Sequence, residues 1–160
     1  MALLKTDHII KTFENWYICK CELCNDLFAI TIDGRRKSYC SCSLSISKLN
    51  NKQNIVYILE NGQSFYKIGL SSKSSLDYRI KVINEGFIKL NLKPFYCIKT
   101  LNIKSRSIAY SIERMLLYSF KDLKAFPIKP YIFEGQREII KDLNIFALNN
   151  RIKTLISLFK

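Results

Sequence analysis

Five cysteines near the N-terminus are close enough in sequence to bind one metal ion. Cys19, Cys21, Cys24, Cys40 and Cys42 lie within 24 residues, as two close groups separated by about 15 residues. This spacing is typical of sites in which four thiolates hold structural zinc. Cys21, Cys24, Cys40 and Cys42 form the more regular pairing for four ligands. Cys19 is then either a spare cysteine or a substitute ligand.

The alternative to zinc is a reduced, metal-free cluster of buried cysteines. The segment has few other core residues, and such small units rarely fold without a metal or disulfides. A reducing compartment argues against disulfides, so we favour zinc. Residues 27–32 alternate and are β-branched, Asp33 and Gly34 predict a turn, and a second short strand runs through Tyr39. This pattern predicts a hairpin that the metal closes.

The cysteine segment resembles the small zinc knuckle found near the ends of many phage-borne nucleases. That knuckle has the pattern Cys-x-Cys-x-Cys-Gly-Asn followed by Ser-Cys-Gly-Cys, and residues 24–25 and 39–42 occupy those places here. The chain has one extra residue between Cys21 and Cys24 and lacks both glycines, so the assignment of the ligands stays open.

A second set of polar residues lies inside elements predicted further along the chain. Tyr57 belongs to the apolar run 55–59, and Tyr66 and Lys67 belong to the run 64–69. Asn61 and Gly62 stand between these runs, which predicts two strands joined by a tight turn. The two tyrosines and the lysine are therefore expected in a β-hairpin.

Arg79 and Glu113 are expected in two helices. Arg79 lies in the segment 74–84, where apolar residues recur at helical spacing and Gly86 follows as the expected C-cap. Glu113 lies in the segment 105–123, on an otherwise apolar helical stripe, and therefore needs solvent, a partner such as Arg79, or a metal ion. Residues 94–101 predict a third strand, in which Cys97 is expected to be a core residue.

This order of elements resembles the GIY-YIG nuclease fold over roughly residues 54–141. Residues 56–58, Val-Tyr-Ile, stand for the first tripeptide, although its usual glycine is missing. Residues 66–69, Tyr-Lys-Ile-Gly, stand for the second, with one inserted lysine. This form, like the later segment 133–138, is similar to a branch typified by a phage T5 open reading frame and by viral homologues. Leu117 stands where that branch often carries a histidine.

The resemblance implies an α+β fold, in which a small three-stranded antiparallel sheet is flanked by helices and preceded by the zinc-bound hairpin. It also implies catalytic roles. Glu113 would hold Mg²⁺ or Mn²⁺, and Arg79 would pair with non-bridging phosphate oxygens. Tyr57 would orient or deprotonate water, Tyr66 would bind the phosphate or share that task, and Lys67 would lower a tyrosine pKa or contact phosphate.

Outside the motif, these residues have structural explanations. Tyrosines in strands are commonly packing residues, and Arg79 with Glu113 would be a plain ion pair. The only histidine is His8, far upstream, which disfavours Ser-His and Cys-His triads and an HNH nuclease. The leading hypothesis is a metal-dependent DNA endonuclease whose knuckle aids DNA binding. The alternative is a weakly active or inactive DNA-binding or regulatory module that keeps the fold.

The charge of the chain favours a polyanionic partner such as DNA. Lys and Arg number 26 against 13 Asp and Glu, which gives +13, and residues 1–52 contribute only +3 of this. The larger unit should therefore make most phosphate contacts. An AT-rich coding sequence is the alternative explanation of the many lysines. Predicted DNA contacts are Arg35, Arg36 and Lys37 at the hairpin tip, where solvated charge is the alternative, together with Lys73 and Lys81.

The chain thus divides into a zinc-knuckle region over residues 1–50 with its core at 15–43, a nuclease-like domain over 54–143, and a helix over 144–160. That last segment is amphipathic, and we expect it to pack on the domain, with a homodimer contact or a DNA-facing surface as alternatives. No apolar stretch approaches the roughly 20 residues that cross a bilayer, and no secretory signal is recognised. We expect a cytoplasmic protein, in the host cell if the source is a phage or virus.

Overall fold

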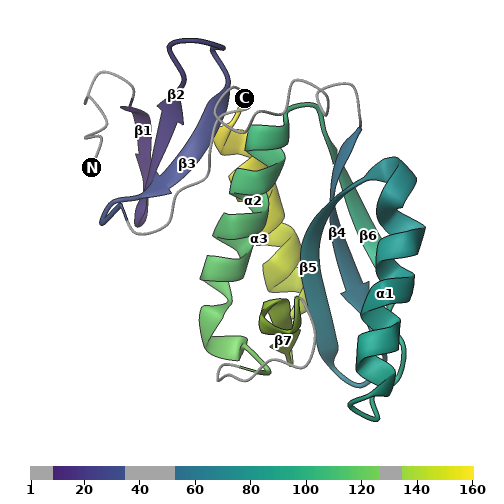
Figure 1. The fold of residues 1–160 in the computed structure, drawn as a ribbon. Coiled ribbons are helices and arrows are strands. Elements are labelled where there is room, and N and C mark those ends of the chain that lie inside the picture. Colours follow the sequence, from purple (N-terminus) through teal and green to yellow (C-terminus); the bar gives the residue numbers. More distant parts are fainter. Residues whose placement is uncertain (1–8, 35–52, 127–134) are drawn as a thin grey trace.

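A computed structural model describes residues 9–34, 53–126 and 135–160. Over these ranges the chain forms two antiparallel sheets and three α-helices (Figure 1). This arrangement confirms the α+β class that the sequence predicts. Among the described residues, no helix has both the length and the apolar character that a bilayer crossing requires.

The N-terminal sheet has the strand order β1-β2-β3. It is built from β1 (Ile9–Phe13), β2 (Trp16–Lys20) and β3 (Leu27–Thr31). Strand β3 is the first strand of the predicted hairpin, and it pairs with β2 from Trp16↔Thr31 to Lys20↔Leu27. The predicted second strand, through Tyr39, lies outside the described residues. The strands β1 and β2 are additions that the sequence pattern did not reveal.

The second sheet carries the predicted Asn-Gly hairpin at its centre. Its strands are β4 (Asn54–Glu60), β5 (Phe65–Ser72), β6 (Tyr96–Ile103) and β7 (Ile139–Lys141), in the order β6-β4-β5-β7. In the turn, Asn61 Oδ1 accepts hydrogen bonds from the backbone N–H groups of Gln63 and Phe65, and Gly62 takes a φ of 69°. A three-stranded sheet was expected, and β7 adds a fourth strand.

Three helices cover the two faces of this sheet. Helix α1 (Leu76–Ile88) packs on one face, and α2 (Arg106–Ser119) and α3 (Ile145–Leu158) pack on the other (Figure 1). The prediction that Gly86 caps the first helix is wrong, because α1 continues through Ile88 and Gly86 is buried within it. Gly86 is therefore an interior residue of the helix and does not terminate it.

The N-terminal sheet docks on α2 through three serines. Two of them, Ser107 and Ser111, belong to the helix, and the third, Ser105, is its N-cap. The Ser111 hydroxyl accepts a hydrogen bond from the backbone N–H of Ala29 at 2.9 Å, and the Ser107 hydroxyl donates to the Leu27 carbonyl at 2.9 Å. Ser105 Oγ donates to Asp26 Oδ1 at 2.7 Å. Apolar residues of β2 and β3 also join the core beneath α2. The two sheets therefore share one core and hold α2 between them.

The C-terminal helix packs on the domain, as the first of its three readings predicted. Leu148, Ile152, Leu155 and Leu158 are buried in the core that α2 covers. Its apolar stripe is thus used within the chain, and the alternative homodimer contact gains no support. Cys97 was predicted to be a core residue, and this is wrong, because β6 is an edge strand whose residues 96–98 are exposed.

Candidate active site

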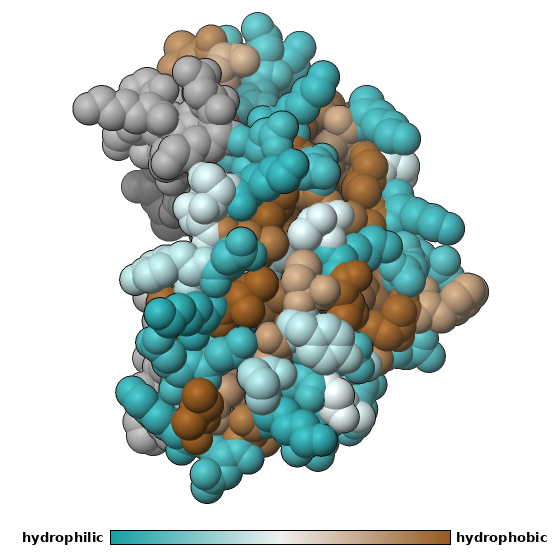
Figure 2. Space-filling view, turned by 90° about the vertical axis from the view of Figure 1, so that its right-hand side faces the viewer, coloured by the Kyte–Doolittle hydropathy of each residue, from teal (hydrophilic) through white to brown (hydrophobic). Residues whose placement is uncertain are grey.

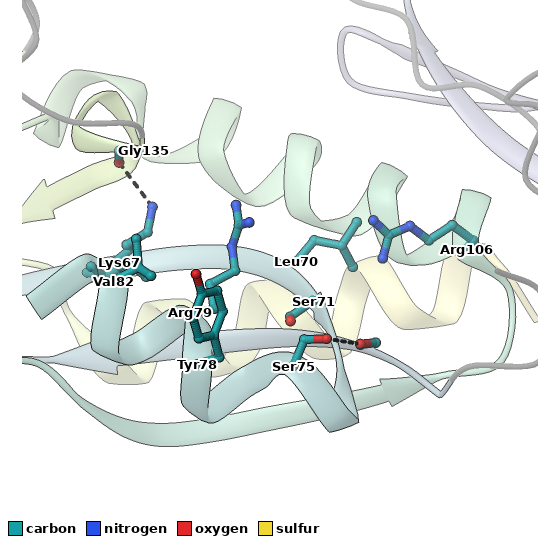
Figure 3. A pocket seen from close by; sticks show the side chains of 11 residues that line it. Lys67, Leu70, Ser71, Ser75, Tyr78, Arg79, Val82, Arg106 and Gly135 are labelled. Atoms are coloured by element: carbon teal, nitrogen blue, oxygen red, sulfur yellow. Dashed lines mark hydrogen bonds between the residues drawn. The ribbon is translucent and has the colours of Figure 1, made fainter.

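Two adjoining hollows lie along β5, between α1 and α2, and Figure 3 shows the residues that line one of them. The first, which we call the α2 hollow, has a volume of about 480 Å³, and most of the charged side chains that line the two hollows belong to it. The second, the α1 hollow, has a volume of about 430 Å³. Leu70, Arg79 and Arg106 line both. The charged residues of the α2 hollow are Arg79, Arg106, Arg114, Lys124, Arg137, Glu113 and Glu138.

The hollows form where β5 extends beyond its short neighbour β7. Among the described residues, β7 pairs with β5 only over Phe65–Lys67, whereas β4 pairs with β5 over its whole length. Side chains from both faces of the sheet can meet past that point. Arg79 reaches across from α1 and Arg106 comes from the first turn of α2 (Figure 3).

Glu113 is the buried acidic group of the α2 hollow. Its side chain is only 9% exposed, and burial, followed by the negative charge of Glu138, raises its pKa to about 7. The charges of Lys67, Arg114 and Arg106 oppose this rise in pKa without cancelling it. Burial makes the ionised carboxylate unfavourable, and a bound divalent cation would stabilise it. Glu113 is therefore a good candidate ligand for a hard divalent cation. Glu138 lines the same hollow and supplies a second carboxylate.

Lys67 is fully buried and holds Glu138. Its Nζ atom donates hydrogen bonds to Glu138 Oε2 at 2.6 Å and to the Gly135 carbonyl at 3.0 Å. Figure 3 shows the second of these contacts at one end of the α1 hollow. The lysine therefore fixes the segment that carries Glu138. This contact differs from the predicted action of Lys67 on a tyrosine.

Tyr57 lies on β4 and is fully buried. Within the described parts of the chain its hydroxyl has no hydrogen-bond partner of ordinary geometry, and the nearest cation that acts on it is Arg79. Burial raises the pKa of Tyr57 to about 12, although Arg79 partly opposes this rise. The hydroxyl thus keeps its proton at neutral pH. It is a poor base, and Tyr57 itself lines neither hollow.

Gly69 gives the Tyr57 ring its space. The two residues pair directly across β4 and β5, and a Cβ atom on Gly69 would lie 2.3 Å from the Tyr57 hydroxyl oxygen and 2.4 Å from its Cζ. Such contacts are impossible without moving a fully buried ring. The glycine of the second tripeptide is therefore required by this close approach, as in other strands where an aromatic ring covers a glycine.

We predict that Gly69→Ala destabilises the fold by roughly 3 kcal/mol, as expected for overpacking in a core. Gly62→Ala is the matched control, since that position has a φ of +69° and open space around it, and should cost about 1 kcal/mol. Urea unfolding of both variants measures the difference. Equal losses of stability would show that the Tyr57 ring is not fixed over Gly69.

The structure does not bring Tyr66 to these hollows. Side chains alternate along a strand, so Tyr66 lies on the face of β5 opposite to Lys67 and Gly69 and joins the core beneath α2 and α3. Its hydroxyl donates to Glu60 Oε1 at 3.4 Å. Burial, with the charge of Glu60, raises its pKa. The inserted lysine of this motif, Lys67, borders the α1 hollow instead.

Of the predicted DNA contacts, Lys73 and Lys81 are exposed and line neither hollow. Arg35, Arg36 and Lys37 lie outside the described residues. Arg106, Arg137 and Glu138 line the α2 hollow, although the sequence did not single them out as site residues. The only signal for Arg137 and Glu138 was their place in the segment 133–138, and nothing in the sequence distinguishes Arg106 from a surface residue.

Two of the four favoured zinc ligands are described. Cys21 and Cys24 belong to a tight turn, in which the Cys21 carbonyl accepts from Asn25 N–H at 2.9 Å and Asn25 takes a left-handed φ of 57°. Cys40 and Cys42 lie outside the described residues. Within the described ranges, no three His, Cys, Asp or Glu residues converge as a metal site. Cys19 is fully buried, and burial raises the pKa of its thiol to about 11.

Comparisons with known proteins give no relative from which to infer a function. No family model matches the chain, and no curated protein or solved structure matches it. The function must therefore be inferred from the residues of the site and their surroundings.

Proposed function

We propose that this protein is a metal-dependent DNA endonuclease of the GIY-YIG type, with its active site in the α2 hollow. The observation that carries the proposal is the surrounding of buried Glu113 by five basic side chains in one hollow next to Tyr57. A hollow rich in guanidinium groups suits a phosphodiester, and a buried carboxylate suits a divalent cation. The basic chain, at +13, supplies long-range attraction for DNA.

The residues present fit one hard divalent cation. Glu113 is a buried carboxylate whose desolvation the neighbouring cations offset only in part, and Glu138 lines the same hollow. These two residues would hold Mg²⁺ or Mn²⁺, with water completing its coordination. When bound, the ion supplies charge neutralisation at the phosphoryl and leaving oxygens.

The other residues bind and orient the substrate. Arg79 and Arg106 stand on opposite sides of the hollows and can hold the non-bridging oxygens of one phosphate. The protonated Tyr57 hydroxyl, which is buried beside Arg79, helps to position that guanidinium. The water oxygen bonds to phosphorus while the bond to the departing 3′-oxygen breaks, and solvent takes one proton from the water and returns one to the leaving group.

A test of this proposal separates cutting from binding. Labelled duplex DNA is incubated with the protein in Mg²⁺, in Mn²⁺ and in EDTA, and the bound and cleaved fractions are measured in each. We expect salt-sensitive binding in all three conditions and cleavage in the two that contain metal. Binding without cleavage in any divalent metal would refute the enzyme and favour a DNA-binding module that keeps the fold.

We also propose that Cys21, Cys24, Cys40 and Cys42 hold one structural zinc. The turn at Cys21 and Cys24 supports this, because Asn25 tolerates the left-handed conformation that the glycine of the knuckle pattern supplies. Zinc in such a unit contributes directly to its folding.

The zinc proposal predicts one zinc ion per chain in mass spectrometry under non-denaturing conditions. Cys24→Ser should lose the ion, whereas Cys97→Ser, an exposed cysteine on β6, should retain it. A metal-free mass for the unaltered protein would overturn the proposal. Loss of zinc in Cys19→Ser with retention in Cys24→Ser would reassign the ligands.

A further inference from the structure

The α1 hollow differs in chemistry from the α2 hollow that adjoins it. None of its lining residues is a carboxylate. Apolar side chains, serine hydroxyls and one exposed aromatic ring form most of its wall. The cations Lys67, Arg79 and Arg106 also line it, so this lining does not suit a metal ion. It suits a flat, partly apolar ligand with polar edges.

Tyr78 and Val82 are exposed on the α1 side of this hollow. Tyr78 is 73% exposed and Val82 is 46% exposed, so neither is held by the core. Figure 2 views the side of the molecule on which α1 lies, and it shows apolar side chains at the surface among hydrophilic ones. Exposed apolar groups gathered at a concave site mark a place for binding. The fold alone does not require an aromatic residue at position 78.

Another part of the hollow is polar. The serines at positions 71, 72 and 75 line it, and Ser72 Oγ donates a hydrogen bond to Ser75 Oγ at 2.8 Å. Each hydroxyl can both donate and accept, which suits the mixed edges of a nucleobase or the oxygens of a sugar. Figure 3 shows Tyr78 and Arg79 projecting from α1 and Arg106 from the start of α2 toward the same space.

The two hollows adjoin and share lining residues. Arg79 and Arg106 line both, so a phosphate that they hold carries its neighbouring nucleoside to the α1 hollow. A base inside a duplex is stacked and paired, and it cannot enter such a hollow without leaving the helix. Only an unpaired base enters at little cost.

We infer that the α1 hollow binds the unpaired nucleobase next to the phosphate held by Arg79, and that the substrate is DNA with an unpaired nucleotide at the cut. This inference rests on the proposed function. Tyr78 provides the surface on which the base stacks, and the serine hydroxyls meet its polar edge or sugar. Stacking on an aromatic side chain accepts any base, so this site selects for lack of pairing and not for sequence.

The first experiment measures base binding without cleavage. Duplexes that carry 2-aminopurine either unpaired in a one-base bulge or fully paired are titrated with the protein in EDTA, and fluorescence is recorded. We expect quenching of the bulged base on binding and affinity roughly ten-fold higher than for the paired duplex. Equal affinity for the two duplexes, with no change in the fluorescence of the bulged base, would overturn the inference.

The second experiment assigns the effect to Tyr78. Tyr78→Ala should lose the preference for the bulge, and Tyr78→Phe should keep it, because the ring and not the hydroxyl stacks on the base. Phe146→Ala is the matched control, since Phe146 is 76% exposed and lines neither hollow. Thermal unfolding of each variant checks the fold. Retention of the preference in Tyr78→Ala would overturn the inference.

These outcomes distinguish the inference from the proposed function. Quenching and preference that depend on Tyr78, without cleavage in any metal, would uphold the base site and refute the nuclease. Cleavage of paired and bulged DNA at equal rates, with no effect of Tyr78→Ala, would uphold the nuclease and refute the base site.

Discussion

Glu113→Gln should lower the rate of DNA cleavage about 10³-fold and, at pH 8, make the protein more stable. Removal of a group that stabilises the transition state costs rate on this scale. The stability change has a separate cause, because the neutral amide avoids the desolvation that raises the pKa of Glu113 to about 7. The variant should therefore be less active and more stable, as expected when a functional group destabilises the fold.

The sign of the pH dependence follows from that pKa. The folded state holds a proton on Glu113 between the ordinary carboxyl pKa of 4.5 and about 7, whereas the unfolded state has lost it. Stability from this group is therefore present below pH 4.5 and falls as the pH rises to about 7. Glu113→Gln should be more stable than the unaltered protein by about 2–3 kcal/mol at pH 8, and nearly equal to it at pH 4.5.

Urea unfolding in EDTA at the two pH values measures this difference. Glu85→Gln is the matched control, because Glu85 is an exposed carboxylate of α1 and lines neither hollow. Its stability difference from the unaltered protein should not depend on pH. If the stability difference between Glu113→Gln and the unaltered protein were also independent of pH, the claim that burial raises the pKa of Glu113 would be contradicted.

Arg79→Lys should lower the cleavage rate of bound DNA by about 10²-fold while it changes DNA affinity little. Lysine keeps the positive charge but lacks the planar fork that can hold two phosphate oxygens at once. It also removes the guanidinium that acts on the Tyr57 hydroxyl. The loss should appear in the rate under single-turnover conditions, with DNA fully bound.

Lys81→Ala is the comparison for Arg79, because Lys81 is an exposed basic residue of the same helix that lines neither hollow. It should weaken binding slightly and reduce its salt dependence, with the rate of bound DNA unchanged. If the Arg79→Lys protein cuts bound DNA at the rate of the unaltered protein, Arg79 has no role in cleavage.

Elements with strong local signals could be predicted from the sequence. The Asn61-Gly62 turn fixed the hairpin of β4 and β5, and long apolar stripes predicted α2 and α3. The short strands β1, β2 and β7 could not be found, because their pairing depends on tertiary contacts. Gly86 misled the prediction of the end of α1, since a glycine can also serve close packing inside a helix.

The site was predictable in part for similar reasons. Glu113 interrupts an apolar stripe, which is visible in sequence, whereas Glu138 and Arg106 reach the hollow only through the arrangement of elements around β5. The contrast between Tyr66 and Lys67 is more instructive. Neighbours on a strand point to opposite faces, so a motif that places both in one site conflicts with β geometry unless the strand bulges. The register of Gly69 opposite Tyr57 places Lys67 on the same face as Tyr57.

The most direct test is the relaxation of supercoiled plasmid by the unaltered protein and by Glu113→Gln, in Mg²⁺ and at concentrations that bind equal fractions of the DNA. We predict nicked or linear product from the unaltered protein, and formation of this product about 10³-fold more slowly by Glu113→Gln. Equal nicking by the two proteins, or no nicking by the unaltered protein in Mg²⁺ or Mn²⁺, would contradict an active site built around Glu113.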